Sequence, residues 1–217
     1  RQYTRWLAAE EIAPADPLRD MKPVKLDNKV VEVYTEDDLV ALIKTCAGKD
    51  YIDRRDEAIL RLLTETGLRA HEVVGLDLDD VDLRQGVVTV RRGKGGKGRR
   101  VAIGAKTCRA IDRYLRARRG HRLADSPKLW LGRREVLGYH GLWRMIRRRA
   151  AMAGVDAARP HRFRHTFASR WLEKQGGENA LMAAGGWSRR EMLDRYVLST
   201  TQQRAIEEAR RLNLGEL

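Results

Sequence analysis

Apolar residues recur at the spacing of an α-helix through most of this chain. In the first third, the spacing predicts helices over residues 35–43, 53–66 and 70–76. After residue 105, it predicts helices over about 106–119, 139–153, 161–175, 178–185, 189–196 and 201–212. Thr35, followed three residues later by Asp38, has the pattern of a helix N-cap, and Gly67 is expected to end the second helix.

The period changes to that of a β-strand between the third and fourth predicted helices. Residues 87–90 and 101–103 are rich in valine and isoleucine, and the glycine-rich segment 93–98 lies between them. This pattern predicts a β-hairpin with a basic tip. The fold class is therefore mainly α with a small antiparallel β-sheet (α+β). The order of elements excludes a doubly wound α/β fold, which needs alternating strands and helices.

Breaks in the pattern divide the chain into segments 1–20, 21–33, 34–200 and 201–217. The first has a short amphipathic stretch that ends at Pro14 and Pro17, and we expect it to be the end of a helix from an upstream unit. The second, with Pro23 and few apolar residues, is expected to be a linker. The third is the main domain, and the fourth is expected to be a C-terminal helix.

The charge of the chain indicates a negatively charged partner. Lysine and arginine number 44 against 30 aspartate and glutamate residues, which gives a net charge of +14 and a pI near 10.3. This favours nucleic acid over an anionic membrane surface. No apolar run is long enough to span a bilayer, and the residues at the start of the sequence do not have the pattern expected for a signal peptide. Cys46 and Cys108 are isolated, so we expect both to be reduced in a cytoplasmic protein.

Two basic residues of the first half stand beside glycines. Arg69 follows a glycine break and has Glu72 three residues on, a spacing that orients a guanidinium towards phosphate or forms an ordinary surface ion pair. Lys94 lies in the glycine-rich turn, where a solvated lysine is the simpler interpretation. The turn lacks the spacing, the Ser or Thr and the following helix of a P-loop, so ATP binding is not supported.

Two further groups of residues lie in the second half. His161 and Arg164 share one helical face near a helix N-terminus, a position suited to an anion. His161 and His165 have the spacing of a metal pair, but no HExxH pattern or third ligand accompanies them, so we exclude a metal site. Tyr196 has a hydroxyl whose ordinary pKa of about 10 makes it a poor nucleophile without nearby positive charge.

These groups together resemble the tyrosine recombinase (phage integrase) family in order, spacing and flanking sequence. Residues 66–73 resemble its first arginine box, residues 93–97 its lysine hairpin, and residues 160–168 its His-x-x-Arg box. Trp187 lies where the family has His or Trp, and Tyr196 follows nine residues later. The resemblance covers residues 34–200 and implies the tyrosine recombinase catalytic-domain fold.

The resemblance also implies the chemistry. Arg69 and Arg164 would clamp the scissile phosphate, and Tyr196 would attack it to form a 3′-phosphotyrosyl link. Lys94 would protonate the departing 5′ oxygen, although Lys97 in the same turn is the alternative. A 5′-hydroxyl of a partner strand would then reseal the DNA, so no cofactor, ATP or metal is implied.

The remaining site residues have supporting roles in this resemblance. His161 would donate to the phosphate or act as the base for Tyr196, and Trp187 would complete the pocket by packing and by its indole N–H. Glu72 would orient Arg69 from behind. Further contacts to DNA are expected from Arg91, Arg92, Lys97 and Arg162.

The expected partner is double-stranded DNA at attachment sites, with a homotetramer on paired duplexes and a monomer or weak oligomer when free. Residues 1–20 would be the remnant of a core-binding domain, and residues 201–217 would be exchanged between protomers or pack on their own domain. Alternative functions are a type IB topoisomerase-like enzyme and a catalytically decayed DNA-binding module. A metal-dependent nuclease lacks ligands. The sequence leaves open the target site and the choice among integration, excision, resolution and transposition.

Overall fold

The structure, a computed structural model, describes residues 2–21, 32–91, 98–156, 158–190 and the single residues 193, 210 and 212. Its helices are α1 (Gln2–Ala9), α2 (Glu36–Lys44), α3 (Tyr51–Thr66), α4 (Ala70–Gly75), α5 (Ala105–Arg118), α6 (Tyr139–Ala153), α7 (Pro160–Glu173) and α8 (Glu178–Gly185). A 3₁₀ turn, Leu78–Asp80, precedes three short strands, which are β1 (Val81–Asp82), β2 (Val87–Val90) and β3 (Arg99–Ala102). The predicted α+β class is confirmed.

The helix boundaries follow from local capping. Thr35 and Asp38 form the predicted capping box at the start of α2. Helix α3 starts two residues earlier than the prediction of residue 53, because the Asp50 side chain accepts a hydrogen bond from the Asp53 backbone N–H. Gly67 ends α3 in the left-handed conformation with φ of 57°, as expected for a glycine at this position.

The sheet has three antiparallel strands in the order β1-β2-β3. The predicted hairpin is present, with Val88 opposite Val101 and Val90 opposite Arg99. The two-residue strand β1, which the sequence analysis did not predict, pairs with β2 at its other edge. The tip of the hairpin lies outside the described residues.

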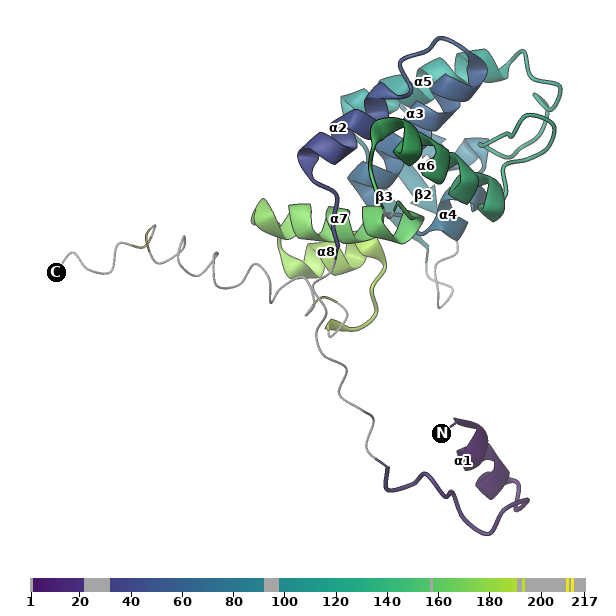
Figure 1. Ribbon diagram of the computed structural model, residues 1–217, viewed down its shortest axis with the longest axis vertical. Helices are drawn as coiled ribbons and strands as arrows, with labels where there is room; N and C mark the ends of the chain where they lie inside the picture. Colours follow the sequence, from purple (N-terminus) through teal and green to yellow (C-terminus); the bar gives the residue numbers. More distant parts are fainter. Residues whose placement is uncertain are drawn as a thin grey trace.

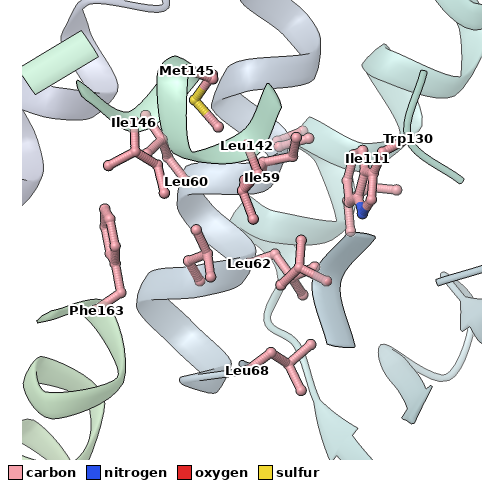
Figure 2. Close-up of a cluster of buried hydrophobic side chains, with 14 of the residues drawn as sticks. Ile59, Leu60, Leu62, Leu68, Ile111, Trp130, Leu142, Met145, Ile146 and Phe163 are labelled. Carbon is pink, nitrogen blue, oxygen red and sulfur yellow. The ribbon is translucent and has the colours of Figure 1, made fainter. Parts of the chain in front are cut away.

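The main core surrounds α3 (Figure 1). Figure 2 shows Ile59, Leu60 and Leu62 of α3 among side chains from the neighbouring helices α5, α6 and α7. All three residues are fully buried, and α3 packs directly on α5 and α7. Tyr34 also belongs to this core, where its ring lies 4.6 Å from that of Phe163. The burial of this apolar surface fixes α3, and with it the turn at Gly67.

A second, smaller cluster lies between α7 and α8, which run side by side in Figure 1. Phe167 and Leu172 of α7 pack there with Leu181 of α8, and Trp187 just after α8 joins them. The second helix of this pair also contacts β3. Helix α8 is thereby held against both α7, which carries His161 and Arg164, and strand β3 of the hairpin.

An irregular segment connects α5 and α6. The buried guanidinium of Arg118 donates to the backbone carbonyls of Ala124, Ser126, Lys128 and Leu129. These bonds replace the regular hydrogen bonding that a strand or helix would supply. They fix the approach of the chain to the N-terminus of α6.

No residue of α1 is buried against the rest of the described chain. The predicted helices over 189–196 and 201–212 and the predicted linker lie largely outside the described residues, and the proposed division into segments stays a prediction. Cys46 and Cys108 are both free thiols. Within the described ranges, every helix is too short or too polar to cross a lipid bilayer.

Candidate active site

Arg69 lies at the junction between α3 and α4. It is the N-cap residue of α4, directly after the turn at Gly67. Gly67 is required there because its φ is positive and an added Cβ would lie 2.5 Å from a ring carbon of Phe167. The Arg69 guanidinium donates to Glu72 Oε1 at 3.0 Å and to the carbonyl oxygen of Gly186 at 3.0 Å. The side chain is 29% exposed, so it is oriented but still accessible.

Arg164 projects from α7 into the same region. Its residue is only 2% exposed. The guanidinium donates to the carbonyl of Gly67 at 3.0 Å and to that of Gly185 at 2.7 Å. Its central carbon lies 3.8 Å from the centre of the Trp187 ring, which is a cation–π contact. Trp187 therefore packs behind Arg164 and limits the positions that this guanidinium can occupy.

His161 is one helical turn before Arg164 on α7. Pro160 supplies the first residue of this helix, a position where proline is favoured. Partial desolvation, together with the charges of Arg164, Arg159 and Arg69, lowers the pKa of His161 below its usual value of 6.5. The imidazole is therefore neutral at pH 7 and can accept a proton.

Arg69, His161 and Arg164 line one cavity of about 330 Å³. Pro160 also lines it, and His71, Tyr139 and Trp143 contribute an aromatic wall. The rings of His71 and Tyr139 stack at 4.5 Å with an angle of 16° between their planes. The cavity combines two oriented guanidinium groups with a neutral imidazole, which suits a phosphate diester more than a neutral ligand.

Glu72 lies behind Arg69 and is almost completely shielded, with a side chain 6% exposed. It accepts the Arg69 backbone N–H at 2.8 Å in addition to the Arg69 guanidinium. It also accepts hydrogen bonds from both terminal nitrogens of Arg99, each at 2.8 Å. Burial alone would raise the pKa of Glu72, but the hydrogen bonds and charges of the two arginines outweigh burial and lower it to about 2.

Arg99 is a site residue that the sequence analysis missed. It is the first residue of β3, and the alternation along this strand places it on the same face as the buried Val101 and Ile103. A charged residue on the buried face of a strand signals a buried partner. That signal was present in the sequence, but nothing local pointed to Glu72, which lies 27 residues earlier.

Several predicted site residues are placed elsewhere or fall outside the description. Lys94, Tyr196, Arg92 and Lys97 lie outside the described residues, so their predicted roles remain predictions.

Two predicted DNA contacts are engaged elsewhere in the fold. Arg91 is paired with Asp80 at the end of β2. Arg162 points away from the cavity, with its guanidinium 4.3 Å from the Tyr34 ring centre and bonded to the Asp156 and Val33 carbonyls. Among the described residues, no group of three His, Cys, Asp or Glu side chains is placed to hold a metal ion.

Comparison with solved structures identifies the fold. The structure of XerA recombinase superimposes with a TM-score of 0.70 at 24% identity, over 94% of this chain and 81% of that one. A structure of XerH site-specific recombinase bound to a palindromic difH substrate gives a TM-score of 0.73 at 20% identity, over 88% and 57% of the two chains. The fold is therefore that of the tyrosine recombinase catalytic domains.

The sequence comparisons identify the family. The profile described as "Phage integrase family" matches residues 32–203, so this chain belongs to the phage integrase, or tyrosine recombinase, family. It is 32% identical to tyrosine recombinase XerD of Mycobacterium leprae (strain TN), over 93% of this chain and 65% of the relative. It is 34% identical to tyrosine recombinase XerC of Azotobacter vinelandii (strain DJ / ATCC BAA-1303), over 93% and 64%. The chain thus spans slightly less than two thirds of the length of these relatives.

Proposed function

We propose that this chain carries the DNA-cleaving and rejoining activity of a site-specific recombinase, with Tyr196 as its nucleophile. One observation carries the proposal. Arg69 and Arg164 come from different helices, yet their guanidinium groups bond to the adjacent carbonyls of Gly186 and Gly185 and line one cavity with His161. Two guanidinium groups held in this way match the two non-bridging oxygens of a DNA phosphate.

The proposed reaction is a transesterification at phosphorus. The Tyr196 oxygen forms a bond to the scissile phosphorus while the bond from phosphorus to the 5′ oxygen breaks. Neutral His161 accepts the proton of the tyrosine hydroxyl, and Lys94, with Lys97 as the alternative, donates a proton to the departing 5′ oxygen. Arg69 and Arg164 stabilise the extra negative charge of the five-coordinate transition state, which exceeds that of the ground state.

The second step reverses the first on a new strand. A 5′-hydroxyl of a partner strand attacks the phosphotyrosine, and the tyrosine oxygen leaves and regains its proton. The number of phosphate ester bonds is unchanged, so no nucleotide is consumed. In the proposed complex, four copies of the protein act on two duplexes, as the resemblance implies, and the protein acts in the cytoplasm of a bacterial or phage-infected cell. The similarity to relatives named as Xer recombinases supports this proposal.

A covalent-trapping experiment tests the proposal. Binding sites are first selected from a random-sequence duplex library with the full chain. A selected site is then nicked near the cleavage position, so that the short 5′-hydroxyl fragment diffuses away and the covalent intermediate accumulates. The products are denatured in detergent with EDTA present. We expect a covalent protein–DNA band for the wild type, none for Tyr196→Phe, and an undiminished band for Tyr3→Phe, a control that removes an exposed phenol.

The outcomes separate the alternatives. Absence of an adduct on every selected site, with binding retained, would leave a catalytically decayed DNA-binding module. An adduct that relaxes supercoiled plasmid but never transfers its strand to a second duplex would indicate a type IB topoisomerase-like enzyme. Transfer to a second duplex supports the recombinase.

A further inference from the structure

The last carbonyls of α8 each accept a hydrogen bond from a different arginine. Arg99 Nε donates to the Ala184 carbonyl at 2.7 Å, Arg164 to the Gly185 carbonyl, and Arg69 to the Gly186 carbonyl. The C-terminal end of a helix carries partial negative charge and leaves its last carbonyls without intrahelical partners. The end of α8 is therefore an acceptor platform that holds three guanidinium groups side by side.

Two of these arginines also share the carboxylate of Glu72. Each carboxylate oxygen accepts one bond from Arg69 and one from Arg99, which uses the roughly four acceptor positions that the group has. The three charged groups sum to one net positive charge. Without Arg99, Glu72 would form its ion pair with Arg69 alone, and the pair would be close to neutral.

The backbone near Arg99 is shaped for its guanidinium. Gly186 has a φ of +64°, and an added Cβ would lie 3.0 Å from one Arg99 nitrogen and 3.1 Å from its central carbon. The side chain of Arg99 is only 10% exposed, and all three of its nitrogens are bonded. Such a group is in a fixed position and is too enclosed to serve as a primary contact to DNA.

We propose that Arg99 is a positioning residue of the cleavage site, which fixes Arg69 through Glu72 and ties the base of the hairpin to the end of α8. The inference rests on the proposed function, because it assigns Arg99 to the same cleavage reaction. Arg99 opens β3, two residues after Lys97 in the sequence. Its bonds to Glu72 and to the Ala184 carbonyl connect this strand to the groups that hold Arg69 and to the end of α8, which holds Arg164. In the proposed reaction, the proton donor and the phosphate clamp must act on the same phosphate together.

The test measures single-turnover cleavage of the nicked duplex and, separately, equilibrium binding to an intact site, for the full chain. We expect Arg99→Gln to slow adduct formation by about 100-fold, the size of effect seen for a misplaced catalytic group, while DNA affinity stays close to that of the wild type. The neighbouring Arg100→Gln removes the same charge from an exposed side chain that bonds to Gln85, and it should cleave at the wild-type rate.

Two further variants distinguish positioning from other roles. Arg99→Lys keeps the charge but cannot form the two-pronged bond to Glu72 together with the bond to Ala184, so it should recover little of the rate. If Arg99 acts through Arg69, the double variant Arg69→Gln/Arg99→Gln should cleave no more slowly than Arg69→Gln alone.

Each contrary result overturns the inference. Cleavage at the wild-type rate by Arg99→Gln, or full recovery of the rate by Arg99→Lys, would show that the geometry of the Arg99 guanidinium is not needed. Multiplicative losses of rate in the double variant would show that Arg99 acts independently of Arg69. Thermal unfolding of each variant is measured in parallel, and failure of both Arg99→Gln and Arg99→Lys to fold would make Arg99 a stability residue instead. Absence of any wild-type adduct would instead refute the proposed function.

Discussion

At the scale of single residues, the carboxylate of Glu72 joins stability to the geometry of the site. It is buried behind Arg69, and it stays ionised because hydrogen bonds from Arg99 and Arg69 outweigh the penalty of burial. The folded protein therefore binds a proton at Glu72 less readily than the unfolded chain does. Above pH 4.5 this residue contributes to the free energy of unfolding, and the contribution disappears as the pH falls towards 2.

The substitution Glu72→Gln tests this linkage. Between pH 4.5 and pH 2, protonation of Glu72 should lower the free energy of unfolding of the wild type by roughly 3 kcal/mol. Because glutamine does not titrate, the variant should not show this part of the decrease. Urea unfolding at a series of pH values measures the difference. Glu178→Gln makes the same change at a partly exposed pair with Arg190 and should leave most of the pH dependence intact. Parallel pH profiles for the wild type and Glu72→Gln would contradict this account.

The same scale shows what local sequence reveals of the site. Local patterns made Arg69, His161 and Arg164 candidates only, and the resemblance to the tyrosine recombinase family predicted them as site residues. The structure places all three around one cavity. Arg99 was missed because its role depends on contacts with distant residues, Glu72 and Ala184. Long-range pairing of this kind is set by the packing of β3 against α8, which no local pattern encodes.

At the scale of elements, a buried charge network joins α3 to α6. Asp56 of α3 is fully buried and bonds to Arg55 on its own helix and to Arg148 and Arg149 on α6. The last of these also donates to the carbonyl of Thr45 at the end of α2 at 2.6 Å. Asp53 of α3 also accepts a bond from Arg149 at 2.7 Å, so two carboxylates hold α6, whose Tyr139 and Trp143 contribute to the aromatic wall of the cavity.

We expect Asp56→Asn to destabilise the protein by about 3–5 kcal/mol, because it removes the carboxylate that pairs with buried Arg55 and leaves buried Arg149 with Asp53 alone. Urea unfolding monitored by circular dichroism measures the change. Asp112→Asn removes the exposed pair with Arg116 on α5, and its effect should stay below about 1 kcal/mol. Equal effects for the two substitutions would show that the network does not fix the packing of α6.

The first half of α6 also borders a larger basic cavity of about 720 Å³. Its lining includes Arg133 and Arg134, which precede the helix, and Arg144 within it. All three are exposed, and none of them forms an ion pair with another described residue. Tyr139 lines both cavities, so we expect a duplex whose scissile phosphate occupies the smaller cavity to extend towards these arginines.

Neutralising these arginines should therefore weaken DNA binding in a salt-dependent way. The plot of log affinity against log salt concentration has a negative slope. For each phosphate that the protein no longer neutralises, this slope should become less steep by about 0.9. Fluorescence anisotropy at several salt concentrations measures the slope for Arg133→Gln, Arg134→Gln and Arg144→Gln. Arg116→Gln, an exposed arginine on α5 outside this cavity, is the control. Slopes equal to that of the wild type would remove this cavity from the DNA-binding surface.

Elements with a strong local signal were predicted well. The cap at Thr35 predicted the start of α2, and the turn at Gly67 predicted the end of α3. Strand β1 was missed because two residues, Val81 and Asp82, are too short to show a period and pair only because β2 lies beside them. The segment between α5 and α6 gave no pattern, since its order comes from the buried guanidinium of Arg118.

At the scale of the whole molecule, the net charge of +14 and the arrangement of the sites suit a protein that lies along a duplex. In the proposed reaction, more than one copy of the protein acts on the DNA. The segment 201–217 is the proposed link between protomers, because it carries apolar residues among charges. Leu212 in this segment is 54% exposed, so it leaves apolar surface available for a neighbouring copy.

Deletion of residues 201–217 should separate binding from assembly. If this segment docks on a neighbouring protomer, the deletion should lower the cooperativity of binding to two adjacent half-sites, while affinity for one half-site stays close to that of the full chain. Gel-shift titrations on one-site and two-site duplexes measure both quantities. Leu212→Ser should reproduce the loss of cooperativity because it removes the exposed apolar side chain, whereas Asn213→Ser next to it should not. A deletion that weakens single-site binding as much as paired binding would show that the segment packs on its own domain instead.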